Sequence, residues 1–169
     1  CTGAALALKK MMADGGIAGT VRVYGCAAEE TEGAKVYMAR DGLFDDLDAC
    51  LAWHPGPLNA TGLLRTAAVN MLRVRYSGRT AHAGVDPWAG RSALKGAELF
   101  GIGIQFMREH IKPTTRMHYV YSEAGGTPNV VPERAEIFIM IRDQDRTEVN
   151  AVTQWVKDVA SGAATSTQT

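Results

Sequence analysis

Three segments between residues 69 and 141 alternate apolar and polar residues, and this pattern constrains the fold more than any other feature of the sequence. The segments are residues 69–77, 117–121 and 135–141. In the first, Leu72 and Val74 occupy one face while the arginines between and after them occupy the other. A period of two residues is typical of a β-strand with one buried face. The sequence therefore predicts three half-exposed strands.

Two helical segments complete this region. Residues 93–107 carry apolar side chains three and four residues apart, and valines follow at the same spacing after Asp145. Asp145 with Glu148 three residues later is the arrangement of a capping box at a helix start. The small polar residues 162–169 suggest no further element. The order strand, helix, strand, strand, helix lacks one last strand of a ferredoxin-like split βαβ unit, and we expect that strand beyond Thr169.

The first 66 residues follow a different rhythm. They predict the end of a helix before Gly15 and then a strand, a helix and a second strand, at residues 20–26, 32–40 and 49–53. Strands and helices in alternation with brief connections are typical of an α/β layer. We therefore predict a partial α/β domain over residues 1–66 and a ferredoxin-like domain over residues 67–169, with the boundary near Thr66.

Composition narrows the class of protein. Eighteen basic residues balance eighteen acidic ones, so no strong overall charge draws the chain to nucleic acid or membrane. The three cysteines are an odd number and far apart, which argues against a disulfide framework and fits a reducing cytosol. No apolar run approaches the roughly 20 residues of a membrane-spanning helix, and we see no signal peptide. These features predict a cytoplasmic protein without nucleic-acid or membrane partners.

Two adjacent acidic residues, Glu29 and Glu30, come directly after the first predicted strand. In an open α/β sheet, ligands gather at the carboxyl ends of the strands. One carboxylate of such a pair can bind a cation while its neighbour takes a proton from metal-bound water. The simpler interpretation is a solvated acidic pair at a helix start, where the helix dipole favours negative charge. The two residues alone favour this simpler interpretation.

His54 follows the second predicted strand and precedes Pro55. Imidazole is a good ligand for zinc or manganese, and if the two strands are neighbours, His54 and the acidic pair lie at the same edge of the sheet. A single histidine before proline is also commonly structural. Together the carboxylates and the imidazole suggest a metal site without establishing one.

His82 lies in the loop after the first strand of the second region. A loop histidine can donate a hydrogen bond to negative charge that develops on a carbonyl oxygen, although an ordinary surface histidine is the simpler interpretation. His110 and His118 have no comparable context, and we assign them structural roles.

Residues 125–132 form a glycine-rich turn that includes Asn129. The turn lacks the lysine and the helix start of a phosphate loop. Asn129 either binds a carboxylate or carbonyl group or stabilises the turn. Arg142 ends the third strand and either pairs with an anionic substrate as a two-pronged donor or is a charge at the rim.

Read in order, four stretches resemble the metallopeptidase family that includes aminoacylases, glutamate carboxypeptidases and bacterial succinyl-diaminopimelate desuccinylases. They are residues 25–30, 53–55, 77–82 continuing through 90–93, and 125–132. The resemblance implies a catalytic α/β domain with an inserted ferredoxin-like lid that also dimerises, with an identical chain or a related subunit. It implies an amidohydrolase that acts on small N-acyl or N-aroyl amino acids and releases an amino acid such as glutamate.

The resemblance also implies the roles of individual residues. Glu29 would be the general base that takes a proton from water. Glu30 and His54 would each bind one of two divalent metal ions, zinc or manganese. His82 would project into the partner subunit's site and stabilise the tetrahedral oxyanion.

The substrate's carboxylate would be held by Asn129 and Arg142. The family's first ligand segment should precede Cys1 and its last histidine ligand should follow Thr169, so we expect both ends of the chain to be cut. Alone, we expect it to bind metal poorly or not at all and to be inactive.

Two alternatives stay open. A dipeptidase or aminoacylase would keep the mechanism and change the substrate, because the shape of the pocket decides that choice. A non-catalytic dimerisation module belongs to a different class, in which the lid has a role of its own and its exposed sheet edge pairs with another lid.

Overall fold

The computed structural model describes residues 1–62 and 66–169. Its contacts divide the chain into two compact units, Cys1–Thr61 and Gly62–Thr169, so the division lies a few residues before the boundary that the sequence suggests near Thr66.

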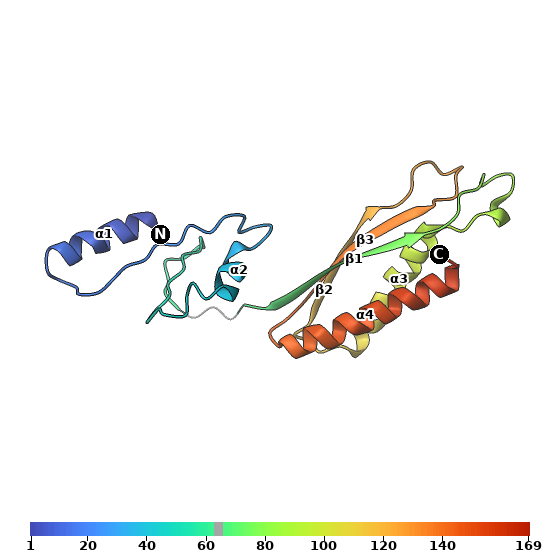
Figure 1. Cartoon of the computed structure of the whole chain (residues 1–169). Helices are drawn as coiled ribbons and strands as arrows, with labels where there is room; N and C mark the ends of the chain where they lie inside the picture. The colour runs from blue at the N-terminus through green and yellow to red at the C-terminus, as the bar shows by residue number, and fades with distance from the viewer. Residues whose placement is uncertain (63–65) are drawn as a thin grey trace. The chain divides into compact units, whose positions relative to one another are not determined.

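The second unit is built on a three-stranded antiparallel sheet in the order β1-β3-β2 (Figure 1). The strands are β1 (Ala68–Ser77), β2 (Arg116–Glu123) and β3 (Arg134–Asp143). Two long helices, α3 (Ala93–Met107) and α4 (Arg146–Thr167), complete it. All three predicted strands and both predicted helices of this region are confirmed, in the predicted order.

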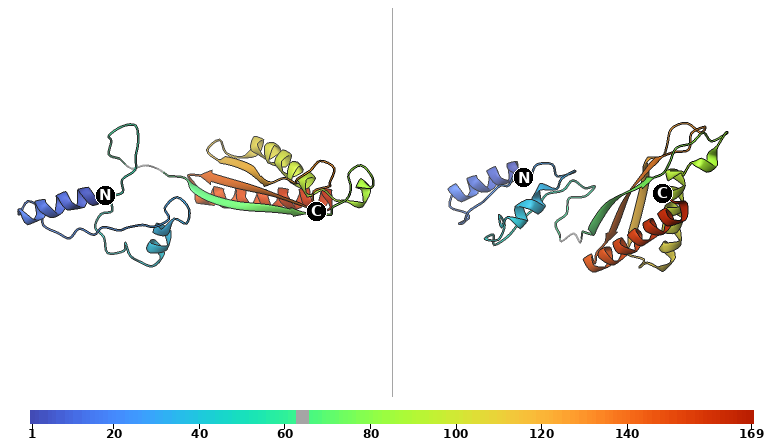
Figure 2. Two further views of the ribbon diagram at one scale, coloured as in Figure 1. Left: turned by 90° about the horizontal axis from the view of Figure 1, so that it is seen from above. Right: turned by 45° about the vertical axis from the view of Figure 1, so that its right-hand side comes forward.

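Both helices pack on the same face of the sheet (Figure 2). The alternation within β3 places its isoleucines on this face, and they are fully buried against apolar residues of α3 and α4. The largest fully buried side chains of this core are Phe100, Ile104, Met117, Ile137, Ile139, Ile141, Val149 and Val156. The opposite face of the sheet, which we call the open face, carries the polar residues of the alternation.

Helix α4 begins where the sequence predicts, but the predicted capping box at its start is only half formed. The Asp145 side chain caps it by accepting a hydrogen bond from the Thr147 amide (2.8 Å). The reciprocal half of a capping box does not form, because Glu148 pairs with the Lys112 ammonium group at 2.7 Å instead.

The end of α4 corrects the expectation that residues 162–169 add no element, because the helix continues to Thr167. Hydroxyl groups in this last part donate to backbone carbonyls four residues earlier, as Thr165 does to Ser161 and Ser166 to Gly162. Such bonds satisfy small polar residues inside a helix, and Ala163 is buried in the core.

Two single turns of 3₁₀-helix, Pro87–Ala89 and Arg108–His110, interrupt the connections on either side of α3. The first lies in the long loop between β1 and α3, and the second follows the end of α3 directly.

The first unit contains two helices, α1 (Thr2–Ala13) and α2 (Ala34–Arg40). The predicted strands at residues 20–26 and 49–53 are wrong, since neither segment forms strand pairs in the structure. A strand is stable only when its backbone groups pair with a neighbour, and residues 1–61 provide no such pairing. The α/β layer predicted for this part is therefore not formed.

Within the residues that the structure describes, no helix is both long and apolar enough to cross a membrane. The three cysteines are present as free thiols.

Candidate functional site

Two loops at one end of the sheet bring His82 and Asn129 together. The loop after β1 and the loop between β2 and β3 are joined by backbone hydrogen bonds on both sides of His82. The Ala83 amide donates to the carbonyl of Asn129 (2.9 Å), and the Val131 amide donates to the carbonyl of Ala81 (2.9 Å). His82 itself bridges to Val130 in the antiparallel sense. Two candidate residues from distant parts of the sequence thus share one local structure.

Close backbone packing holds the first of these loops in place. A Cβ atom on Gly78 would lie 1.9 Å from the carbonyl oxygen of Arg91, so only glycine fits where β1 ends. The Arg91 guanidinium donates to the Gln168 side chain beyond α4 (2.5 Å) and to the Gly90 carbonyl (2.6 Å). Arg91, whose backbone pairs with Arg79, thereby links the loop that carries His82 to the end of α4.

The His82 ring is exposed, and its Nδ1 atom accepts a hydrogen bond from the Gly84 amide (3.2 Å). In the neutral imidazole, a nitrogen that accepts carries no proton, so the proton resides on Nε2. His82 thereby presents an N–H donor to the surroundings of the loop. Such a donor is what stabilisation of an oxyanion requires.

Arg142 lies at the opposite end of the sheet. It is paired in register with Val69 of β1 and with Arg116 of β2, whereas the loops of His82 and Asn129 adjoin the other end of β3. The strand from Arg134 to Arg142 spans about 26 Å at ~3.3 Å per residue. Within one copy, Arg142 and the His82–Asn129 pair cannot bind the same small ligand.

The acidic pair is exposed in the first unit. Glu29 lies 3.9 Å from the Lys35 ammonium group, an ion pair between two exposed side chains. His54 is also exposed, and its Nδ1 atom is 2.8 Å from the Pro55 carbonyl oxygen, to which it donates when protonated. The carboxylate oxygens of Glu30 and an imidazole nitrogen of His54 are both atom types that bind divalent metal ions.

The structure does not assemble these groups into a metal centre. Among the described residues, no group of three or more histidine, cysteine, aspartate or glutamate side chains could hold a metal ion. The strand pairing that would bring Glu30 and His54 to one edge of a sheet is not formed. Their assignment as ligands stays a prediction.

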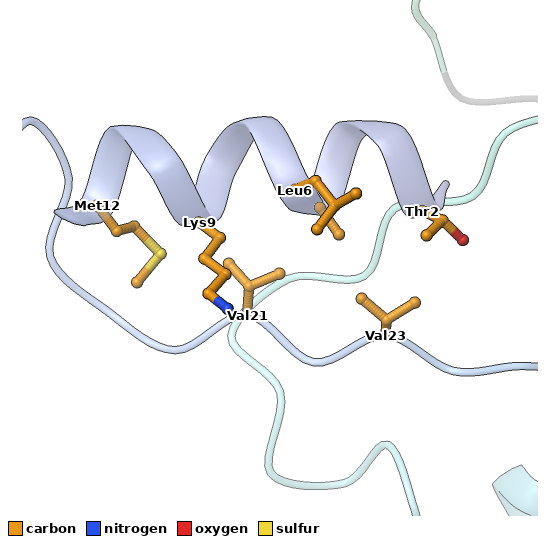
Figure 3. Close-up of a pocket in the computed structure, with 7 residues that line it drawn as sticks. Thr2, Leu6, Lys9, Met12, Val21 and Val23 are labelled. Carbon is orange, nitrogen blue, oxygen red and sulfur yellow. The ribbon is translucent and has the colours of Figure 1, made fainter. Parts of the chain in front are cut away.

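An apolar pocket in the first unit holds none of the candidate residues (Figure 3). It lies between the face of α1 that carries Leu6 and Met12 and the segment that carries Val21 and Val23. The pocket offers apolar contact surface and one ammonium group, from Lys9, and it lacks the paired polar groups of a catalytic site.

The two ends of the open face differ in how their charged side chains are paired. At the end near His82, the Glu136 carboxylate accepts hydrogen bonds from Ser122, Arg73 and Arg75 at 2.6–2.7 Å. These donors lower the pKa of Glu136 from its ordinary value of 4.5 to about 2, the Ser122 hydroxyl and the Arg73 guanidinium contributing most. Glu136 therefore stays ionised over the physiological range.

Sequence reasoning missed two features of this unit. Gly78 and Arg91, which position His82, lie in the stretches that carry the family resemblance, and that was the available signal. The other feature is a row of exposed apolar side chains on α3, formed by Leu99, Ile102 and Phe106. The sequence predicts that these residues lie in a helix, but it does not show that this face of the helix is exposed to solvent.

Residues 69–167 match the family model of the peptidase dimerisation domain of the M20 peptidases. The chain is 42% identical over 167 residues to a subunit of p-aminobenzoyl-glutamate hydrolase of Escherichia coli K12, covering 98% of this chain and 35% of that protein. It is 33% identical over 147 residues to Xaa-Arg dipeptidase of Mus musculus, covering 87% of this chain and 34% of that protein. The chain thus spans about a third of the length of these relatives.

A solved structure shows the same likeness. The aminobenzoyl-glutamate utilization protein from Klebsiella pneumoniae superposes with a TM-score of 0.55 at 27% identity, over 62% of this chain and 26% of that one. The likeness therefore holds in three dimensions as well as in sequence.

Proposed function

Because this chain belongs to the M20 peptidase family, we propose that the whole protein is an amidohydrolase that cleaves N-acyl or N-aroyl amino acids. The 42% identity to a p-aminobenzoyl-glutamate hydrolase supports p-aminobenzoyl-glutamate as the first substrate to test. The observation that carries the proposal is the loop pair that presents the Nε2–H donor of His82 beside Asn129.

The second unit is the lid of this enzyme, and its sheet order β1-β3-β2 supports a ferredoxin-like domain. Its two candidate sites lie at opposite ends of β3. This separation supports an active site shared between two subunits, in which His82 and Asn129 of one lid serve the catalytic domain of the other. Arg142 then binds the carboxylate of a substrate held by its own subunit.

The same lid provides a surface for the partner. Strand β2 is an edge of the sheet, and an unpaired edge invites another strand. Beside it, on the helix side of the sheet, Ile102 and Phe106 of α3 are 51% and 72% exposed. Burial of exposed apolar side chains of this kind stabilises association by about 25 cal/mol per Å². The lid therefore pairs with a second lid, of an identical chain or a related subunit.

In the catalytic domain, Glu29 is the general base, a role that typically contributes ~10²–10⁴-fold to the rate. An oxyanion donor such as His82 contributes ~10²–10³-fold. The substrate's carboxylate is oriented by Arg142 and Asn129. In the whole protein, Glu30 and His54 would each hold one of two divalent metal ions, zinc or manganese, and these ions would supply Lewis acidity at the amide carbonyl.

A second candidate is a dipeptidase with the same arrangement of residues, which the similarity to Xaa-Arg dipeptidase favours. The two activities differ in the groups that the scissile amide joins: an acyl or aroyl group and an amino acid in one case, and two amino acids in the other. A hydrolysis panel that contains p-aminobenzoyl-glutamate and a set of dipeptides distinguishes them.

The test of the function uses the whole protein, the Glu29→Ala and His54→Ala variants, and elemental analysis of bound metal. We expect divalent metal in the unaltered protein, less in His54→Ala, and loss of hydrolysis in both variants. If the whole protein holds no divalent metal and both variants hydrolyse as well as the parent, the proposal of a metal-dependent enzyme is contradicted. A non-catalytic dimerisation module is then the remaining interpretation.

A further inference from the structure

The end of the open face that holds Arg142 carries a second arginine directly beside it. Arg116 of β2 is the register partner of Arg142 in β3. Directly opposed residues on an antiparallel pair share a face, with Cβ atoms about 4.5–5.5 Å apart. His118, the next residue of β2 on that face, is diagonal to Arg142. All three side chains are exposed.

Like charges in opposed positions destabilise a sheet, and nothing on this face neutralises them. In the described part of the chain, neither Arg116 nor Arg142 forms an ion pair. Arg116 donates to the backbone carbonyls of Pro113 and Thr115, and Arg142 has the Met140 sulfur atom as its hydrogen-bond partner (3.6 Å). At the other end of the same face, Glu136 neutralises part of the arginine charge.

The carboxylates near this end are all engaged elsewhere. Asp143 is buried on the helix side, where it accepts hydrogen bonds from Thr114 and Thr115 at 2.8 Å. Asp145 caps α4, and Glu148 pairs with Lys112. Two exposed arginines in opposed positions, neither with a carboxylate partner in the described residues, can together hold an external anion, since a guanidinium group can bind a carboxylate by two parallel hydrogen bonds.

We propose that Arg116 binds a second carboxylate beside the one held by Arg142, and that the enzyme therefore selects substrates whose amino-acid part is acidic. His118 contributes a further hydrogen-bond donor. This inference rests on the proposed function, and it names the substrate class as conjugates of glutamate or aspartate. A substrate that ends in arginine would bring a third guanidinium group to the same place and is disfavoured by charge repulsion.

The kinetic test compares an N-acyl-glutamate with the matching N-acyl-glutamine, which has the same shape and no side-chain charge. We expect the whole protein to prefer the glutamate substrate in kcat/KM by about 10- to 100-fold, as for one hydrogen-bonded charge pair. In Arg116→Gln we expect the two substrates to have kcat/KM values within a fewfold of each other. The variant should keep the Tm of the parent. Arg75→Gln, on the same face but paired with Glu136, keeps the preference and is the matched control.

A binding test uses the chain itself and needs no catalysis. Glutarate, followed by the NMR signals of the His118 ring, is expected to bind saturably and more tightly than butyrate. Arg116→Gln should weaken glutarate binding by about tenfold, and Arg75→Gln should leave it unchanged.

Each outcome decides one claim. If glutarate and butyrate bind alike, or if both arginine variants lose the same affinity, the face is only generally basic and the inference is wrong. If the whole protein hydrolyses both substrates equally well, the function stands and the inference fails. If it hydrolyses neither, the proposed function fails, and the glutarate titration alone decides whether Arg116 is part of an anion site.

Discussion

Gly78 occupies the point where β1 passes into the loop that carries His82. Because an added Cβ atom would lie 1.9 Å from the Arg91 carbonyl oxygen, Gly78→Ala must displace backbone. We expect it to lower the free energy of unfolding of the lid by about 2–3 kcal/mol, as for overpacked sites. Chemical denaturation of the chain measures this change.

The matched control is Gly126→Ala in the neighbouring loop. A Cβ atom there meets no other atom within 4 Å, so this variant should unfold like the parent. Equal stability of the two variants would show that the loop after β1 relaxes freely, and that His82 is not held as described.

Glu136 makes the lid sensitive to acid. Its pKa of about 2 in the folded chain lies below its ordinary value of 4.5, so the ionised form stabilises the fold. That stabilisation is complete above about pH 4.5 and is lost as the pH falls toward 2. We expect the Tm of the parent to fall over this range and the Tm of Glu136→Gln to fall less.

Thermal unfolding monitored by circular dichroism between pH 2 and pH 6 checks this expectation. Some acid sensitivity should persist in Glu136→Gln, because hydrogen bonds from the Asp145 amide and two threonine hydroxyls also lower the pKa of Asp143. Identical pH profiles for parent and variant would contradict the role assigned to Glu136.

At the residue scale, the candidate site residues of the lid can be predicted from the sequence. Which of them lie close together in space cannot. His82, Asn129 and Arg142 stand out by their positions in loops and at a strand end. That His82 and Asn129 lie together, with Arg142 at the other end of the sheet, depends on the register of β1, β2 and β3. β1 pairs with β3 across the intervening helix α3 and strand β2, and no local pattern reports this long-range pairing.

At the scale of the secondary-structure elements, helix α3 has apolar residues on two of its faces. One face is buried on the sheet, and the other exposes Ile102 and Phe106 beside the edge strand β2. We expect Phe106→Glu to weaken self-association of the lid by at least tenfold, since it places a charge within the apolar contact. Sedimentation equilibrium of the chain measures the change.

Trp155 on α4 provides the control for this experiment. It is an exposed aromatic residue on the other helix, so Trp155→Glu should leave self-association unchanged. If Trp155→Glu dissociates the lids and Phe106→Glu does not, the partner surface has been placed on the wrong helix.

Ile139 tests the core of the sheet. It is fully buried in the central strand β3, and Ile139→Ala should cost about 2–5 kcal/mol of unfolding free energy. Met71 of β1 lies on the open face and is more than half exposed, so Met71→Ala should cost far less. Similar losses in the two variants, measured by urea denaturation, would contradict the assignment of the buried face.

The elements of the lid were predictable because local pattern and global packing agree there. Each strand has a neighbour, and each helix has an apolar face that meets the sheet. The predicted strands at residues 20–26 and 49–53 failed for the opposite reason. Their composition suits a strand, but residues 1–61 offer them no partner strand, and pattern alone cannot supply one.

For the whole molecule, the central proposal is that one active site uses residues of two subunits. The distance of roughly 26 Å that separates Arg142 from the His82–Asn129 loops within one lid is the structural reason for this proposal. The proposal also assigns Glu30 and His54 as metal ligands, on the basis of the family and the chemistry of their ligand atoms.

Mixing two inactive variants of the whole protein tests the shared site directly. His82→Ala should lack the oxyanion donor and Glu29→Ala the general base, so each alone should hydrolyse p-aminobenzoyl-glutamate poorly. Mixed and allowed to exchange subunits, they should regain about a quarter of the parental activity, because half the dimers then carry one complete site. Mixed dimers that form, as shown by differently tagged subunits, and yet stay inactive would contradict the shared site.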